Sequence, residues 1–273
     1  MPLILVGTPI GNLGDLSARA AEALAGADVV CCEDTRRTGR LFQLAGIERT
    51  ARFVRVDDHT EAERVDEVVD RVRRGERVVV VSDAGMPGIA DPGERLVAAV
   101  AAAGLPVEVV PGPSAAITAL VASGLPADEW HFHGFLPRKK GELREVLARA
   151  SSTLIAFESP RRLPATLALL AEVDPDREAA VCRELTKAHE EIVRGTAAEL
   201  AERYTSGPPK GEIVLVIAPP ASRSANRDAP DLAALDALKN LVDAGAHPRK
   251  AATVVASLTG TSANALYRAL TSE

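Results

Sequence analysis

The sequence predicts an α/β protein of two domains followed by a small helical extension. Short β-rich apolar runs alternate with amphipathic segments over the first 218 residues, which is typical of βαβ units. The chain has 273 residues, which suits two domains at roughly 100–200 residues each. A segment rich in Pro, Ala, Ser and Arg then precedes three short helical patterns. We therefore expect domains at 1–125 and 126–218, a linker at 219–230 and a helical extension at 231–273.

The first domain is predicted to hold a mainly parallel sheet, because each apolar run is followed by a helical pattern. Its expected strands are 3–7, 28–33, 77–82 and 107–110. Its expected helices are 16–25, 37–44, 61–74, 92–103 and 114–123. In a sheet of this kind ligands bind at the carboxyl ends of the strands, so the turns there are the places to look for a site.

A second cycle of elements follows a break near 124–128. Strands are expected at 130–135, 153–157, 179–184, 191–194 and 212–218, and helices at 142–150, 162–171 and 197–204. Beyond the linker, helices are expected at 232–244, 249–258 and 262–270, in an arrangement like a helix-turn-helix or a small bundle. Nucleic-acid binding and a simple packing or dimer contact explain this extension about equally well.

Composition narrows the class of function. The net charge is −6, from 32 Lys and Arg against 38 Asp and Glu, which argues against non-specific coating of nucleic acid but allows local basic patches. The three cysteines form no CxxC pair, so buried thiols are expected and no metal site. No apolar stretch reaches the roughly 18 residues that span a bilayer, and Met1–Val6 lacks a basic leader. A cytoplasmic protein is expected.

Two of the four turns at strand ends have a plain structural explanation beside a functional one. The Gly-rich run from Gly7 to Gly14 matches neither GxGxxG nor a phosphate loop, so a tight turn explains it well by itself. The run from Glu33 to Arg37 puts acids and bases beside a helix start. Either Asp34 or Thr35 there caps the helix, or the run is functional and Glu33 or Asp34 orients a hydroxyl group.

The other two turns favour a ligand more clearly. Residues 82–93 are unusually rich in Gly and Pro for a segment that directly follows a buried strand. Such a loop suits recognition of an adenosine-like ligand by main-chain groups, with Asp83 fixing one polar end. In the run from Pro111 to Ala116, Ser114 is a good N-cap, and the same helix start offers a ligand contact.

Taken together, these turns resemble the small-subunit ribosomal RNA methyltransferase I family of the tetrapyrrole-methylase superfamily. The ordered matches run from residue 8 to about 218 and include Thr8–Leu13, Glu33–Arg36, Ser82–Gly85 with Asp91–Gly93, Pro111–Ala115, Ala122–Pro126, Gly134–Gly141, Glu158–Leu163, Arg183–Glu191 and Lys210–Ile217. The resemblance implies a tetrapyrrole-methylase-like fold, with S-adenosylmethionine in the cleft between two domains. It also implies a homodimer and 2′-O-methylation of a cytidine ribose in the decoding region of 16S rRNA, in the small ribosomal subunit.

The resemblance also assigns residues. Cofactor contacts are implied for Pro9, Ile10, Asp83, Gly85, Met86, Ser114, Ala115, Phe157, Leu185 and Gly211. A ribose hydroxyl is a poor nucleophile and benefits from a base within hydrogen-bond reach, for which the candidates are Glu33, Asp34 and His59. Here the sequence departs from the family, because Val56–Thr60 keeps only the second histidine of a Tyr-His-Glu-His-Asn run. His59 is therefore either a base or a bystander.

Phosphate contacts are expected from Arg36, Arg37, Arg138, Lys139, Lys140, Arg161 and Lys187. Two other functions remain open. The same fold could methylate a tetrapyrrole or another small molecule, because fold does not fix substrate and a porphyrinogen also carries carboxylates. The chain could also be a non-enzymatic RNA-binding assembly factor that acts through its C-terminal helices.

Overall fold

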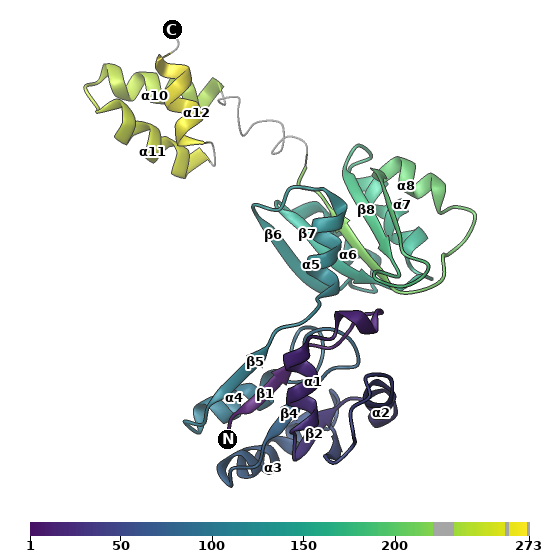
Figure 1. The fold of residues 1–273 in the computed structure, drawn as a ribbon. Helices are drawn as coiled ribbons and strands as arrows, with labels where there is room; N and C mark the ends of the chain where they lie inside the picture. Colours follow the sequence, from purple (N-terminus) through teal and green to yellow (C-terminus); the bar gives the residue numbers. More distant parts are fainter. Residues whose placement is uncertain (221–231, 260–261, 272–273) are drawn as a thin grey trace.

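The computed structural model describes residues 1–220, 232–259 and 262–271, and these form two five-stranded sheets with their helices and a separate cluster of three helices (Figure 1). The first sheet has the order β3-β2-β4-β1-β5, and its registered pairs are all parallel. Its strands are β1 Leu3–Val6, β2 Val29–Cys32, β3 Arg52–Arg55, β4 Val78–Val80 and β5 Val107–Val110. The parallel sheet predicted for this half is thus confirmed.

Helices cover both faces of the first sheet, which explains why its central strands are continuous apolar runs. The helical segments of this half are η1 Leu13–Asp15, α1 Ala18–Ala25, α2 Thr35–Leu44, α3 Glu61–Arg73 and α4 Glu94–Ala102. Apolar side chains of α1 and α2 pack on one face, and those of α3 and α4 on the other. Strand β3 was not expected from the sequence. It is an edge strand flanked by exposed Arg52 and Arg55, so its apolar signal is only two residues long.

The second sheet has the order β6-β7-β10-β8-β9. Its strands are β6 Trp130–Phe135, β7 Thr153–Glu158, β8 Glu178–Arg183, β9 Glu191–Thr196 and β10 Ile213–Ile217. Only β6 and β7 pair in parallel, and the other neighbours are antiparallel. One face is covered by α6 Lys140–Arg149, α7 Leu163–Val173 and α8 Ala197–Arg203, whose apolar side chains share its largest core.

Helix α5, Ala115–Ser123, covers the other face of this second sheet. Ala119 and Leu120 belong to the same apolar cluster as Ala180 and Val216. The predicted division at residue 125 falls after this helix, whereas by packing α5 belongs with the second sheet. The chain therefore crosses from the first sheet to the second at residues 111–114, and Figure 1 shows this crossing after β5.

Three C-terminal helices, α10 Leu232–Asp243, α11 Pro248–Thr259 and α12 Ala263–Thr271, pack around a small core of their own that includes Leu238, Val255 and Leu266. The three predicted helical patterns are thus helices. All but the first two residues of the predicted linker lie outside the described residues. Cys31, Cys32 and Cys182 are free and buried, as expected. Within the described ranges, no helix is both long and apolar enough to cross a membrane.

Candidate functional site

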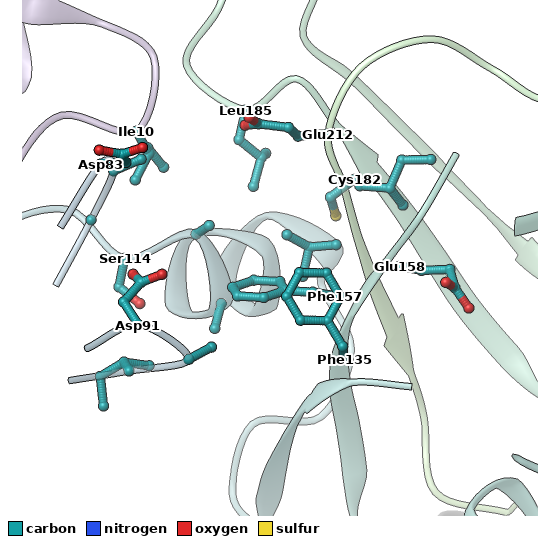
Figure 2. Close-up of a pocket in the computed structure, with 18 of the residues that line it drawn as sticks. Ile10, Asp83, Asp91, Ser114, Phe135, Phe157, Glu158, Cys182, Leu185 and Glu212 are labelled. Atoms are coloured by element: carbon teal, nitrogen blue, oxygen red, sulfur yellow. The ribbon is translucent and has the colours of Figure 1, made fainter. Parts of the chain in front are cut away.

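A cavity of about 490 Å³ lies between the two sheets, within the range of about 300–1,000 Å³ that is typical of small-molecule sites. The first sheet contributes the turns that follow β1, β2 and β4, and the second contributes the ends of β7, β8 and β10. Figure 2 shows Asp83, Asp91 and Ser114 on one side of this cavity and Phe157 and Cys182 on the other. A ligand here would contact both domains.

The turn after β1 is fixed by backbone contacts with its two neighbours. The N–H of Thr8 donates to the Gly85 carbonyl at 2.9 Å, and the N–H of Gly85 donates back to Thr8 at 3.1 Å. A Cβ on Gly7 would lie 2.6 Å from the Cα of Gly112, so this contact between two turns requires glycine. Ile10 projects from the same turn into the cavity wall, while Pro9 does not line it.

The loop after β4 is held in an uncommon backbone conformation. Gly85, Gly88 and Gly93 all have positive φ, and so does Ala90 at 61°, which costs an alanine of order 1–3 kcal/mol. The buried carboxylate of Glu61 stabilises the end of this loop, because its Oε1 accepts the N–H of Gly93 at 2.9 Å and of two residues in the first turn of α4. The loop thereby places Asp83, Met86 and Asp91 on the cavity wall.

Carboxylates dominate the polar part of the wall. The N–H of Asp83 donates to Glu33 Oε1 at 2.9 Å, and Arg37 pairs with Asp83 at 2.9 Å. Desolvation by burial, added to repulsion from Glu33, raises the pKa of Asp91 to about 7. Desolvation also raises the pKa of Glu33, although the hydrogen bond from Asp83 opposes it. Glu33 and Asp91 form no ion pair within the described part of the chain, so the site carries negative charge that a cationic ligand would balance.

The second domain supplies an apolar wall that includes Phe157, Leu185 and Val214. Gly211 borders it with φ at 99°, and a Cβ there would lie 2.4 Å from Glu184 Cγ. Glu184 is itself fixed, because its Oε1 accepts the Lys187 ammonium and the Glu212 N–H, both at 2.9 Å. The glycine therefore gives this edge of the wall its shape.

The structure brings together most of the residues that the sequence proposed for the cofactor. All of them except Pro9 line the cavity: Ile10, Asp83, Gly85, Met86, Ser114, Ala115, Phe157, Leu185 and Gly211. Ser114 is the N-cap residue of α5, as expected, but its side chain makes no capping hydrogen bond.

The three candidate bases are separated. Glu33 lines the cavity, but Asp34 does not, and its side chain caps α2 by accepting the Arg36 N–H at 2.8 Å. His59 is exposed in the loop before α3, outside the cavity lining. Asp91 and Phe135 also line the cavity, although the sequence did not predict a role for either. Each could have been found from the sequence around it, because Asp91 belongs to the Gly- and Pro-rich loop and Phe135 lies just before the basic run at 138–140.

Most of the expected phosphate-binding side chains already have carboxylate partners. Lys139 pairs with Glu142, Lys140 with Glu172, Lys187 with Glu184 and Glu212, Arg36 with Asp34 and Arg37 with Asp83. Arg138 and Arg161 form no ion pair among the residues that the structure describes. Of the seven, only Arg37 lines the cavity, so the others lie outside it.

The chain is similar to known methyltransferases. Residues 2–201 match the family described as tetrapyrrole (corrin/porphyrin) methylases. A protein of Mesorhizobium japonicum named ribosomal RNA small subunit methyltransferase I is 43% identical over 98% of this chain and 90% of its own length. Its namesake from Mycobacterium bovis is 50% identical over 79% of this chain and 77% of its own length.

Among solved structures, the uroporphyrin-III C-methyl transferase from Thermus thermophilus, complexed with S-adenosylhomocysteine, has the same fold. The TM-score is 0.55 at 23% identity, and the match covers 82% of this chain and all of that one. At this level of identity the likeness concerns the fold.

Proposed function

The chain belongs to the tetrapyrrole methylase family, and from that membership we propose the reaction that it performs. It is an S-adenosylmethionine-dependent methyltransferase of small-subunit ribosomal RNA, in agreement with relatives that are 43% and 50% identical. The methylated group is the ribose 2′-hydroxyl of a cytidine in the decoding region of 16S rRNA, and the enzyme works in the cytoplasm. Methylation of a tetrapyrrole, which the fold alone would allow, is the weaker alternative because these close relatives carry the ribosomal RNA name.

The observation that supports this proposal most directly is the charge of the cavity. Among its lining residues, Asp83 is neutralised by Arg37, whereas Glu33 and Asp91 are not paired. S-adenosylmethionine carries a sulfonium and an ammonium group, which such a wall attracts, and its adenosine part suits the apolar side formed by Ile10, Phe157 and Leu185.

When bound, the cofactor supplies an electrophilic methyl group, so the protein chiefly positions its ligands and manages one proton. The rigid turns at Thr8 and Gly85 would hold the adenosine part of the cofactor, and Asp83 is fixed by Arg37 and by the Asp34 N–H. The 2′-hydroxyl must lose its proton as its oxygen bonds to the methyl carbon and the bond from that carbon to sulfur breaks. One of Glu33 and Asp91 accepts it, because burial raises the pKa of each and makes it a better base.

The functional molecule is proposed to be a homodimer. Ile117 and Val121 lie one turn apart on α5 and are 42% and 76% exposed, and Val109 on the edge strand β5 is 48% exposed. Apolar side chains this exposed favour burial against a second copy. Sedimentation of the protein with Val121→Glu should show a shift toward the monomer, and an unchanged dimer would place the contact elsewhere.

The methylation is tested with labelled S-adenosylmethionine and small ribosomal subunits from a strain that lacks the enzyme. Nuclease digestion and mass spectrometry then locate the label. The proposal requires label on the 2′-oxygen of a single cytidine. Cofactor binding without any labelled RNA would contradict the proposed substrate and favour a small molecule instead.

A further inference from the structure

Phe135 is an aromatic side chain that the fold leaves exposed at the cavity. It is the last residue of β6, lines the cavity and is 65% exposed. Its ring meets the Phe157 ring edge to face with centroids 5.5 Å apart, and the centroids of Phe157 and Phe132 are 5.0 Å apart. Figure 2 shows Phe135 and Phe157 together at the cavity. One side of the Phe135 ring is thereby supported while much of its surface faces solvent.

A bulge in β6 is responsible for this placement. Side chains alternate between the two faces of a regular strand, so Phe132 and Phe135, three residues apart, would point in opposite directions. The register against β7 shifts between Phe132 and Gly134, and Gly134 has φ at 74°. Both rings consequently reach Phe157. A Cβ on Gly134 would meet nothing within 4 Å, so glycine is needed for the backbone angle and not for space.

The segment after Phe135 is basic and firmly held. Arg162 donates to the Leu136 carbonyl at 3.0 Å and to the Pro137 carbonyl at 2.6 Å, and the buried Glu158 lies 3.4 Å from the same guanidinium. Arg138 follows directly, and Arg161 adjoins Pro160 of the cavity wall. The Phe135 ring, Arg138 and Arg161 thus lie on adjoining segments outside the acidic interior of the cavity. Neither arginine forms an ion pair among the described residues.

We propose that Phe135 is the platform on which the target nucleobase stacks while its ribose reaches into the cavity, with Arg138 and Arg161 binding the flanking phosphates. This subsite rests on the proposed function and specifies how the RNA is held. Proteins recognise unpaired RNA bases by stacking them on aromatic rings and neutralising the backbone with Lys and Arg, and an enzyme acting on one nucleotide displaces it from the stack.

Two other groups could cover the Phe135 ring, the adenine of the cofactor and a second copy of the chain, and the structure favours neither. The cofactor adenine would contact the deeper wall, where Phe157 and Leu185 already supply apolar surface. A second copy of the chain would cover Phe135 without need of the arginines beside it. The basic charges on the adjoining segments match an RNA backbone better than either of these ligands.

The test compares Phe135→Ala with Trp130→Ala, which removes an exposed aromatic ring from the same strand outside the cavity lining. With unmethylated small subunits as substrate, Phe135→Ala should lower kcat/KM roughly 5- to 100-fold, the loss expected for one stacked base. Its Kd for S-adenosylmethionine, measured by calorimetry, should stay within about twofold. Phe135→Tyr should restore kcat/KM for the subunits, and Trp130→Ala should leave that kcat/KM unchanged.

Three results would overturn the subsite. These are an unchanged kcat/KM in Phe135→Ala, a cofactor Kd weakened as much as kcat/KM, and a change from dimer to monomer in sedimentation. If the unaltered protein fails to methylate subunits, the proposed function itself fails, and no variant is needed to see it. A direct readout uses Trp130→Phe combined with Phe135→Trp, which leaves one indole in the chain. Its fluorescence should be quenched by subunits and not by S-adenosylmethionine alone.

Discussion

Replacing Asp91 by asparagine should make the ligand-free protein more stable, and increasingly so as the pH rises. A pKa raised from 3.8 to about 7 corresponds to about 4 kcal/mol against the ionised carboxylate. The side chain is only part-buried, so solvent screening reduces this, and we take about 2 kcal/mol. The penalty has two causes, the loss of solvation and then repulsion from Glu33 and Asp83.

The sign follows from proton linkage. Below pH 3.8 the folded and unfolded chains both keep the proton on Asp91, so the penalty is absent. It grows as the pH rises toward 7, where the folded protein also loses the proton, and is constant above that. The free energy of unfolding of Asp91→Asn should therefore be higher than that of the unaltered protein by about 2 kcal/mol at pH 8 and by about 1 kcal/mol at pH 5. For a chain of this size, 2 kcal/mol is about 4–8 °C in Tm.

Thermal melts of both proteins between pH 5 and pH 8 measure this difference. Asp57→Asn is the matched control, because hydrogen bonding from Thr60 lowers the pKa of Asp57 and its ionised form stabilises the fold. That variant should lose about the same stability at pH 5 as at pH 8, because Asp57 stays ionised in the folded and the unfolded chain over this range. A gain in Asp91→Asn that is the same at pH 5 and pH 8, or a loss at pH 8, would refute the reasoning.

Three further predictions concern the supports of the site. Gly112→Ala places a Cβ 2.8 Å from Gly7 and should lower the free energy of unfolding in urea by about 1–3 kcal/mol. Gly141→Ala in α6, with open space around it, should be neutral or raise that free energy by up to about 1 kcal/mol, and an equal loss in both variants would contradict the packing argument. Arg162→Lys keeps the charge but not the planar fork, so amides near 136–139 should exchange faster, and unchanged protection would show that the fork is dispensable. Arg138→Ser should reduce the salt dependence of RNA binding by about one phosphate contact, and Lys139→Ser, which loses a side chain already paired with Glu142, should reduce it less.

The sequence by itself determined the α/β class, because the helical and extended periods alternate and the central strands are apolar throughout. It also pointed to turns that the structure places around the cavity. Glycines at 85, 88 and 93 after a buried strand indicate a loop with positive φ angles, which glycine adopts readily. The structure puts that loop on the cavity wall.

Only the tertiary structure decided where the second domain begins and which acids belong to the site. Helix α5 has the same local pattern whichever sheet it covers, so its packing on the second sheet depends on contacts far along the chain. Asp34 and Glu33 are adjacent in sequence, yet one caps a helix and the other faces the cavity, because neighbouring residues at a strand end point in different directions. The raised pKa of Asp91 likewise arises from burial beside Glu33, a residue 58 positions away whose proximity no local pattern encodes.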